Sequence, residues 1–131
     1  MNDSNASLGP DREERFRIRE ITPYQLAGKK PLPMIIDIRE EEEFMRGHID
    51  GAKHISRGDL EQKIAEVAPE HATPIVVYCA VGNRGPLAAE KLHRMGYRNI
   101  SSLKGGLRNW LEAGGMVECP KSGRNSFAGI R

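Results

Sequence analysis

The sequence lacks any apolar run long enough to span a membrane, and it contains only two cysteines and 5% aromatic residues among its 131 residues. A membrane-spanning helix needs about 20 consecutive apolar residues. Segment 1–15 is polar and lacks the apolar stretch of a secretory signal. The net charge of +2 gives no indication of nucleic-acid binding. We therefore expect a soluble, cytoplasmic protein that binds neither a membrane nor nucleic acid.

The scarcity of cysteine also excludes several kinds of site. Cys79 and Cys119 are too few for a disulfide framework, and no Cys-x-x-Cys pair suggests zinc or thioredoxin chemistry. The histidines have no ligand-like spacing either. We therefore expect reduced thiols and no metal site.

The length of the chain fits one domain. We expect a polar lead-in over residues 1–15, a folded domain over 16–117 and a polar tail over 118–131. Short apolar runs, expected to be strands at 16–19, 34–38, 75–78 and 97–101, alternate with helical patterns. The expected helices begin after Thr22, cover 40–45, open at 56–59, and include 88–95 and 107–111. This alternation predicts an α/β fold with a parallel sheet, whose working site lies at the carboxyl ends of the strands.

The segment that follows the apolar run 75–78 has the features of a reactive site. Cys79 comes directly after this buried strand, Arg84 follows after four intervening residues, and Pro86 fits the first turn of a helix. A loop between a strand end and a helix start can direct several backbone N–H groups at one point, which favours negative charge there. Gly82 allows a tight turn, and Arg84 adds a forked cationic donor. The loop therefore predicts a nucleophilic thiolate at Cys79.

This segment, Cys79-Ala80-Val81-Gly82-Asn83-Arg84, resembles the active-site loop Cys-x-x-Gly-x-Arg of the rhodanese family. Two further segments carry the same resemblance in the expected order, over an overall range of about 18–115. They are Asp37-Ile38-Arg39-Glu40 with Gly47-His48-Ile49-Asp50-Gly51-Ala52, and Leu103-Lys104-Gly105-Gly106 with Trp110. The sequence is thus identified as a candidate single-domain rhodanese.

The resemblance implies a three-layer fold with a central five-stranded parallel sheet flanked by helices. It also implies a sulfurtransferase in which Cys79 takes sulfur from a donor such as thiosulfate, forms a persulfide, and passes the sulfur to cyanide or a thiol. The partners would be a small-molecule donor and acceptor, or a protein thiol, without metal or organic cofactor. The loop residues expected to bind the persulfide and substrate are Ala80, Val81, Gly82, Asn83 and Arg84.

The sequence departs from the family pattern at two positions. Ala80 stands where some members carry a charged residue that helps to select the substrate, so donor preference is open. Gly85 stands where serine is frequent, which removes a hydroxyl donor but leaves the nucleophile.

Other polar residues have supporting roles in this interpretation. We expect Asp37, Arg39 and His48 to hold loops through ion pairs or backbone hydrogen bonds rather than to touch the donor. Arg57, in the loop before the helix at Leu60, is a candidate for contacting an anionic donor. Cys119 is expected to be an idle thiol, with resolution of the persulfide as the alternative.

Two other functions use the same kind of loop. A non-catalytic persulfide carrier or interaction module needs the same cysteine, and the sequence does not separate it from an enzyme. A cysteine-based phosphatase or arsenate reductase places five residues between its cysteine and arginine, whereas this chain has four. The shorter loop favours one bound sulfur atom over a tetrahedral oxyanion.

Overall fold

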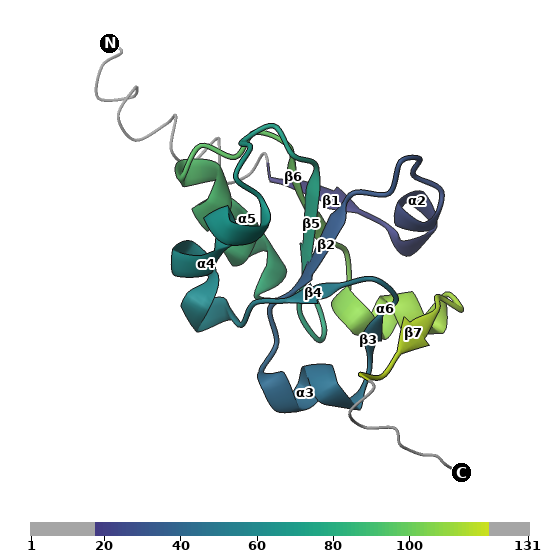
Figure 1. The fold of residues 1–131 in the computed structure, drawn as a ribbon. Helices are drawn as coiled ribbons and strands as arrows, with labels where there is room; N and C mark the ends of the chain where they lie inside the picture. The colour runs from purple at the N-terminus through teal and green to yellow at the C-terminus, as the bar shows by residue number, and fades with distance from the viewer. Residues whose placement is uncertain (1–17, 121–131) are drawn as a thin grey trace.

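The computed structural model describes residues 18–120, and its centre is a five-stranded sheet in which all neighbouring strands are parallel. In spatial order the strands are β1 (Arg19–Ile21), β6 (Ile100–Leu103), β5 (Ile75–Tyr78), β2 (Met34–Asp37) and β4 (Lys53–His54). The predicted five-stranded parallel sheet is confirmed (Figure 1). Because β5 is central, the residue that follows it lies between the ends of β2 and β6.

Helices cover both faces of this sheet, as predicted (Figure 1). Within the described residues they are α2 (Pro23–Ala27), α3 (Glu41–Arg46), η1 (Arg57–Asp59), α4 (Leu60–Val67), α5 (Gly85–Arg94) and α6 (Gly106–Glu112). The helix α2 starts after Thr22, as predicted, with a capping box in which the Thr22 hydroxyl accepts from the backbone of Gln25 while the Gln25 side chain accepts from the Thr22 N–H.

The side chains of the strands alternate between two apolar clusters, one for each face of the sheet. Ile75 and Val77 of β5 pack in a cluster with residues of α4 and α5. Val76 and Tyr78 point the other way and pack with residues of α2 and α6. Cys79 continues the first series, so its side chain belongs to the face covered by α4 and α5.

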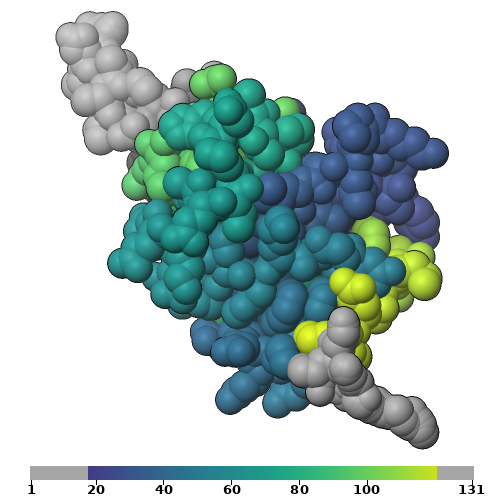
Figure 2. Space-filling model, viewed as in Figure 1, coloured from purple at the N-terminus to yellow at the C-terminus, as the bar shows by residue number. Residues whose placement is uncertain are grey.

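The sequence did not predict a second, two-stranded sheet. In it β3 (His48–Ile49) pairs antiparallel with β7 (Val117–Glu118). The space-filling view shows the yellow segment of β7 lying against the body of the protein at the lower right (Figure 2). The expected boundary between domain and tail, at residues 117 and 118, therefore falls inside β7.

Two expected strands are displaced along the chain. The first strand was expected at 16–19 but β1 covers Arg19–Ile21, and residues 16 and 17 lie outside the described part. The last was expected at 97–101 but β6 covers Ile100–Leu103. Tyr97 precedes β6 because its side chain fills the core beside α4, where its hydroxyl donates to the Ala68 carbonyl at 2.6 Å.

The expected lead-in, 1–15, and most of the expected tail lie outside the described residues. Within residues 18–120, no helix has the length and apolar character needed to cross a membrane.

Candidate active site

The candidate nucleophile, Cys79, lies at the carboxyl end of the central strand. Its residue is only 2% exposed, so its sulfur lies at the floor of the loop that follows. Val81, Asn83 and Arg84 are exposed on the outside of this loop.

Two backbone N–H groups of the loop donate to the Cys79 sulfur. The Gly82 nitrogen lies 3.2 Å from Sγ and the Arg84 nitrogen lies 3.3 Å from it. The φ of Gly82 is +96°, a conformation that glycine adopts at little cost. Because donated N–H groups favour the charged form of an acceptor, this geometry stabilises negative charge on the sulfur.

The underside of the loop is held by the first turn of α6. The Leu107 N–H donates to the Cys79 carbonyl at 2.9 Å, and the Arg108 N–H donates to the Ala80 carbonyl at 3.0 Å. Gly106 allows this approach, since a β-carbon there would lie 2.5 Å from the Cys79 carbonyl oxygen. Gly105-Gly106 was expected only as part of a family signature, without a role, and the structure shows that the pair supports the loop.

Arg84 contributes its backbone N–H, rather than its side chain, to the contacts of the Cys79 sulfur. It caps the N-terminus of α5, and its N–H is one of the two donors to the sulfur. Its side chain is exposed and has no hydrogen bond or ion pair with any residue in the range 18–120. The guanidinium is therefore available for an anion outside the loop.

A buried ionic network lies behind the loop on the opposite face of the sheet. The Arg39 guanidinium donates to the Asp37 carboxylate, with a shortest distance of 2.7 Å, and to the Gly47 carbonyl at 2.6 Å. The Tyr78 hydroxyl donates to Asp37 at 2.6 Å and accepts from the Ile49 N–H at 3.1 Å. The network ties the end of β2 to the end of β5 and to β3.

The network also alters the ionisation of its members. Burial, and then the hydrogen bond to Asp37, raises the pKa of the Tyr78 hydroxyl far above its usual value. Burial lowers the pKa of Arg39, but the hydrogen bond and charge of Asp37 outweigh it and raise the pKa overall. Tyr78 thus remains neutral and acts as a hydrogen-bond bridge. This role of Tyr78 was not predicted, although a tyrosine at the end of an otherwise aliphatic strand is a signal for a polar contact there.

His48 lies between α3 and β7 and makes contacts in both directions. Its Nδ1 lies 3.1 Å from the Phe44 carbonyl oxygen, its Nε2 lies 3.3 Å from a Glu118 carboxylate oxygen, and its ring stacks on Phe44 at 3.7 Å. The Nε2 of His54 lies 2.8 Å from the Arg39 carbonyl oxygen. These contacts brace the segments around β3.

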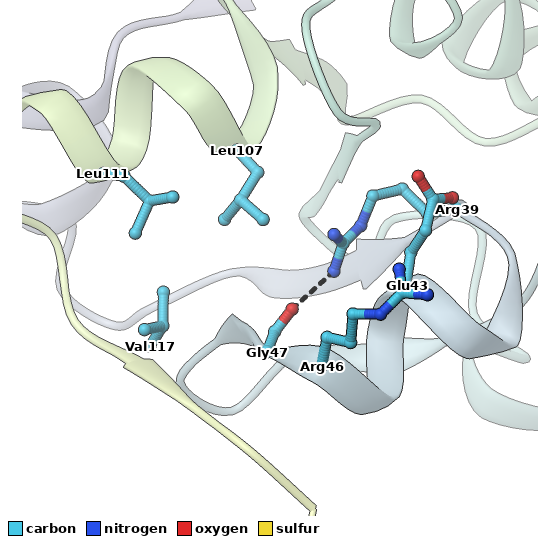
Figure 3. Close-up of a pocket in the computed structure, with 7 residues that line it drawn as sticks. All are labelled: Arg39, Glu43, Arg46, Gly47, Leu107, Leu111 and Val117. Atoms are coloured by element: carbon cyan, nitrogen blue, oxygen red, sulfur yellow. Dashed lines mark hydrogen bonds between the residues drawn. The ribbon is translucent and has the colours of Figure 1, made fainter.

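A cavity of about 290 Å³ lies beside this network, between α3, α6 and β7. The Arg39 guanidinium and the Gly47 carbonyl, joined by their hydrogen bond, lie at one side, while Leu107, Leu111 and Val117 form an apolar wall (Figure 3).

The remaining candidates are not part of the loop itself. Arg57, in η1, lines a groove along α5, and its side chain makes no hydrogen bond or ion pair among residues 18–120. Cys119 is exposed after β7, and its sulfur lies 3.5 Å from the Arg46 carbonyl oxygen. No cluster of three metal-ligating side chains occurs in the described part of the chain.

Comparison with known proteins agrees with this architecture. A family model for the rhodanese-like domain matches residues 23–113. Thiosulfate sulfurtransferase GlpE of Tolumonas auensis is 33% identical over 92 residues, which are 69% of this chain and 85% of that protein. The uncharacterized Bacillus subtilis protein YqhL is 37% identical over 87 residues, 66% of this chain. The chain spans 65% of the length of YqhL and 40% of the length of YrkF, a putative sulfur carrier protein of the same organism.

Solved structures give the same result. A rhodanese-related protein from Thermoplasma volcanium is 30% identical, with a TM-score of 0.70 over 78% of this chain and 99% of that one. A Rhodopseudomonas palustris protein, described as of unknown function and a possible tyrosine phosphatase, is 32% identical, with a TM-score of 0.73 over 82% of this chain and 90% of that one. Since the family model matches well over half of the sequence, the chain belongs to the rhodanese-like domain family.

Proposed function

We propose that this chain is a sulfurtransferase that moves sulfane sulfur from thiosulfate or a similar donor to a thiophilic acceptor through a persulfide on Cys79. The convergence of two backbone N–H groups on the Cys79 sulfur carries the proposal. Relatives named thiosulfate sulfurtransferase, 33% and 35% identical, support the choice of reaction.

The first half-reaction is a displacement at the outer sulfur of thiosulfate. The Cys79 thiolate attacks that sulfur, a new S–S bond forms, and the bond to the sulfonate group breaks with release of sulfite. The negative charge moves to the outer sulfur of the persulfide. The Gly82 and Arg84 N–H groups stabilise the initial thiolate, and the exposed Arg84 guanidinium attracts the dianionic donor.

The second half-reaction returns the cysteine to its starting state. A nucleophilic acceptor, cyanide in the test tube or a thiolate, attacks the outer sulfur. The S–S bond of the persulfide breaks, and Cys79 leaves as the thiolate. Neither half-reaction transfers a proton once the attacking group is a thiolate or cyanide, which fits a loop whose polar groups are amides and an arginine.

Intact-mass analysis tests this proposal. After incubation with thiosulfate the protein should gain one sulfur atom, and cyanide should remove it. Cys79→Ser should abolish the gain, whereas Cys119→Ser, which changes an exposed thiol beyond β7, is the matched control and should retain it. A Cys79→Ser protein that still passed sulfur from thiosulfate to cyanide would contradict the assignment.

A second candidate is a persulfide carrier, suggested by the relative named a putative sulfur carrier protein. A carrier uses the same Cys79 persulfide but receives or delivers its sulfur only on a partner protein. Steady-state turnover of thiosulfate and cyanide by the purified chain distinguishes the two. Many turnovers per molecule identify an enzyme, whereas a single slow loading event identifies a carrier.

A further inference from the structure

A groove of about 570 Å³ runs along one side of α5. Leu87, Lys91 and Arg94 lie at i, i+4 and i+7 on one stripe of that helix and form one wall, and Arg57 with Gly58 of η1 forms the other. From Leu87 to Arg94 the helix rises roughly 10 Å. The volume is in the range of small-molecule sites.

The charge in this groove is mostly positive. Three cationic side chains line it against one carboxylate, Glu90, whose Oε2 lies 2.8 Å from the Arg94 guanidinium. The side chains of Arg57 and Lys91 have no ion-pair partner in the described part of the chain. Leu87 is 57% exposed and adds an apolar surface at one end. The groove thus offers two available cations and one apolar contact to a ligand.

The end of the groove at Leu87 lies close to the Cys79 loop. Leu87 is in the first turn of α5, where the Ala88 N–H donates to the Arg84 carbonyl at 3.0 Å, and the Arg84 N–H donates to the Cys79 sulfur. Ala88 lines the groove and packs in the same apolar cluster as Cys79. The groove therefore lies on the face of the sheet to which the Cys79 side chain points.

The opposite wall is fixed to the same edge of the sheet. The Arg57 N–H donates to the Ile38 carbonyl at 3.0 Å, and the Ile38 N–H donates to the Tyr78 carbonyl at 3.0 Å. Arg57 is thus held one strand away from the residue that precedes Cys79, so both walls start beside the reactive loop.

From this geometry we propose that the groove binds the anionic part of a small thiol acceptor, with its carboxylates paired to Arg57 and Lys91 and its thiol directed at Cys79. This inference rests on the proposed sulfur transfer. In the step concerned, the acceptor thiolate attacks the outer sulfur of the Cys79 persulfide. The S–S bond to Cys79 breaks, Cys79 leaves as the thiolate, and the acceptor carries the sulfur away as its own persulfide. A tripeptide thiol with two carboxylates has an extended length of roughly 10 Å, which matches the groove.

The test measures the second half-reaction alone. Each protein is loaded with thiosulfate, desalted, and mixed with glutathione, with glutathione diethyl ester or with cyanide, and loss of the persulfide is followed by rapid-quench intact mass. The diester keeps the thiol and the peptide but neutralises both carboxylates. The variants are Arg57→Gln/Lys91→Gln and, as a matched control, Lys29→Gln/Arg98→Gln, which removes the same number of exposed cations outside the groove.

The ratio of the glutathione rate constant to the cyanide rate constant should fall about five- to tenfold in Arg57→Gln/Lys91→Gln and stay within twofold in the control. In the unsubstituted protein, the rate constant for transfer to the diester should be lower than that for transfer to glutathione. High salt should lower the rate constant for transfer to glutathione. An unchanged ratio, or an equal fall with the diester, would overturn the anionic-acceptor site. A large fall in the control would also overturn it, since net charge alone would then explain the effect. Failure of the unsubstituted protein to load or to react with cyanide would instead overturn the proposed function, so the two failures are distinguishable.

Discussion

Gly106 lies against the backbone of Cys79, such that a β-carbon on Gly106 would be 2.5 Å from the Cys79 carbonyl oxygen and 2.8 Å from the Gly82 nitrogen. The Gly82 nitrogen is one of the two donors to the Cys79 sulfur. The first turn of α6 therefore sets the position of the groups that surround the thiol, even though α6 contributes no side chain to them.

Gly106→Ala should consequently impair both stability and chemistry. The φ of +62° costs a side chain about 1–2 kcal/mol, and the obstructing atoms belong to the backbone, so the loop itself must move. We expect persulfide formation from thiosulfate to slow by roughly tenfold or more, since about 1.4 kcal/mol of lost stabilisation corresponds to tenfold.

Gly114→Ala is the matched control for this substitution. Gly114 has a φ of +85° but nothing lies within 4 Å of its hypothetical β-carbon. The Gly114→Ala protein should have a free energy of unfolding lowered by a similar conformational cost, but its rate of persulfide formation should be unchanged. Urea unfolding and single-turnover loading measure the two effects. If Gly106→Ala loads as fast as Gly114→Ala, α6 does not position the loop.

A second pair of residues explains why glycine occupies position 85, where serine is frequent in the family. A β-carbon on Gly85 would lie 2.5 Å from Ser102 Oγ, a fully buried hydroxyl that has no hydrogen-bond partner in the described structure. Gly85→Ser should cost about 1–3 kcal/mol through overpacking. Ser102→Ala should be neutral or slightly stabilising, because an unsatisfied buried hydroxyl is lost.

The double variant Gly85→Ser/Ser102→Ala should recover most of that loss. The two residues are in contact, so we expect a coupling energy of about 0.5–3 kcal/mol from urea unfolding of all four proteins. Strictly additive effects would show that Ser102 is not what excludes serine from position 85.

The contacts of Gly106 with the Cys79 loop and of Gly85 with Ser102 could not be predicted from the sequence. The apolar run 75–78 was sufficient to place Cys79 at a strand end, and the capping box at Thr22 was sufficient to start α2, because both signals are local. The number of strands came from the family resemblance. The pairing of β3 with β7 could not be predicted, since two-residue strands show no periodicity.

The contacts around the site depend on residues far apart in the chain. Tyr78 bonds to Asp37 and Ile49, which are separated from it by 41 and 29 positions, so the local sequence signals a polar group at the strand end but does not identify its partners. The position of Arg57 beside α5 likewise depends on how η1 packs. Supporting roles were expected for Asp37, Arg39 and His48, but their partners became known only from the fold.

Tyr78→Phe should destabilise the protein and change its response to alkali. It removes the donor to Asp37 and leaves the Ile49 N–H without its acceptor, at a cost of about 1–3 kcal/mol. The folded state holds the pKa of Tyr78 above its usual value of about 10, so the hydroxyl stays protonated there while the unfolded chain ionises. The contribution of the Tyr78 hydroxyl to the free energy of unfolding is therefore complete below pH 10 and falls as the pH rises above it.

Urea unfolding at pH 8 and pH 11 tests this expectation. The free energy of unfolding should fall less between these values in Tyr78→Phe than in the unsubstituted protein. Tyr24→Phe, which removes a hydroxyl from a residue that is 75% exposed, controls for the chemical change. An equal fall in Tyr78→Phe and the unsubstituted protein would show that Tyr78 makes no contribution above pH 10.

The length of the Cys79 loop distinguishes sulfur transfer from phosphate hydrolysis. Phosphate hydrolysis is the alternative suggested by the Rhodopseudomonas palustris neighbour, which is described as a possible tyrosine phosphatase. Here the Gly82 and Arg84 N–H groups both reach the single sulfur of Cys79, at 3.2 and 3.3 Å. Phosphate hydrolysis needs a wider ring of donors for several oxygens and an acid for the leaving group. We therefore expect negligible turnover of aryl phosphates by this protein.

Insertion of one glycine between Gly82 and Asn83 should weaken sulfur transfer, because it moves the Arg84 N–H and the start of α5 away from the sulfur. Insertion of one glycine after Gly114, at an open turn beyond α6, is the control and should leave turnover unchanged. Thiosulfate turnover and aryl-phosphate hydrolysis are measured on all three proteins. The loop insertion should lower thiosulfate turnover roughly tenfold or more. If the longer loop has room for a tetrahedral anion, phosphate should also protect Cys79 of this variant from alkylation. Substantial phosphatase turnover by the natural protein, without transferable sulfur on Cys79, would show that four intervening residues are enough for phosphate and that the loop-length argument fails.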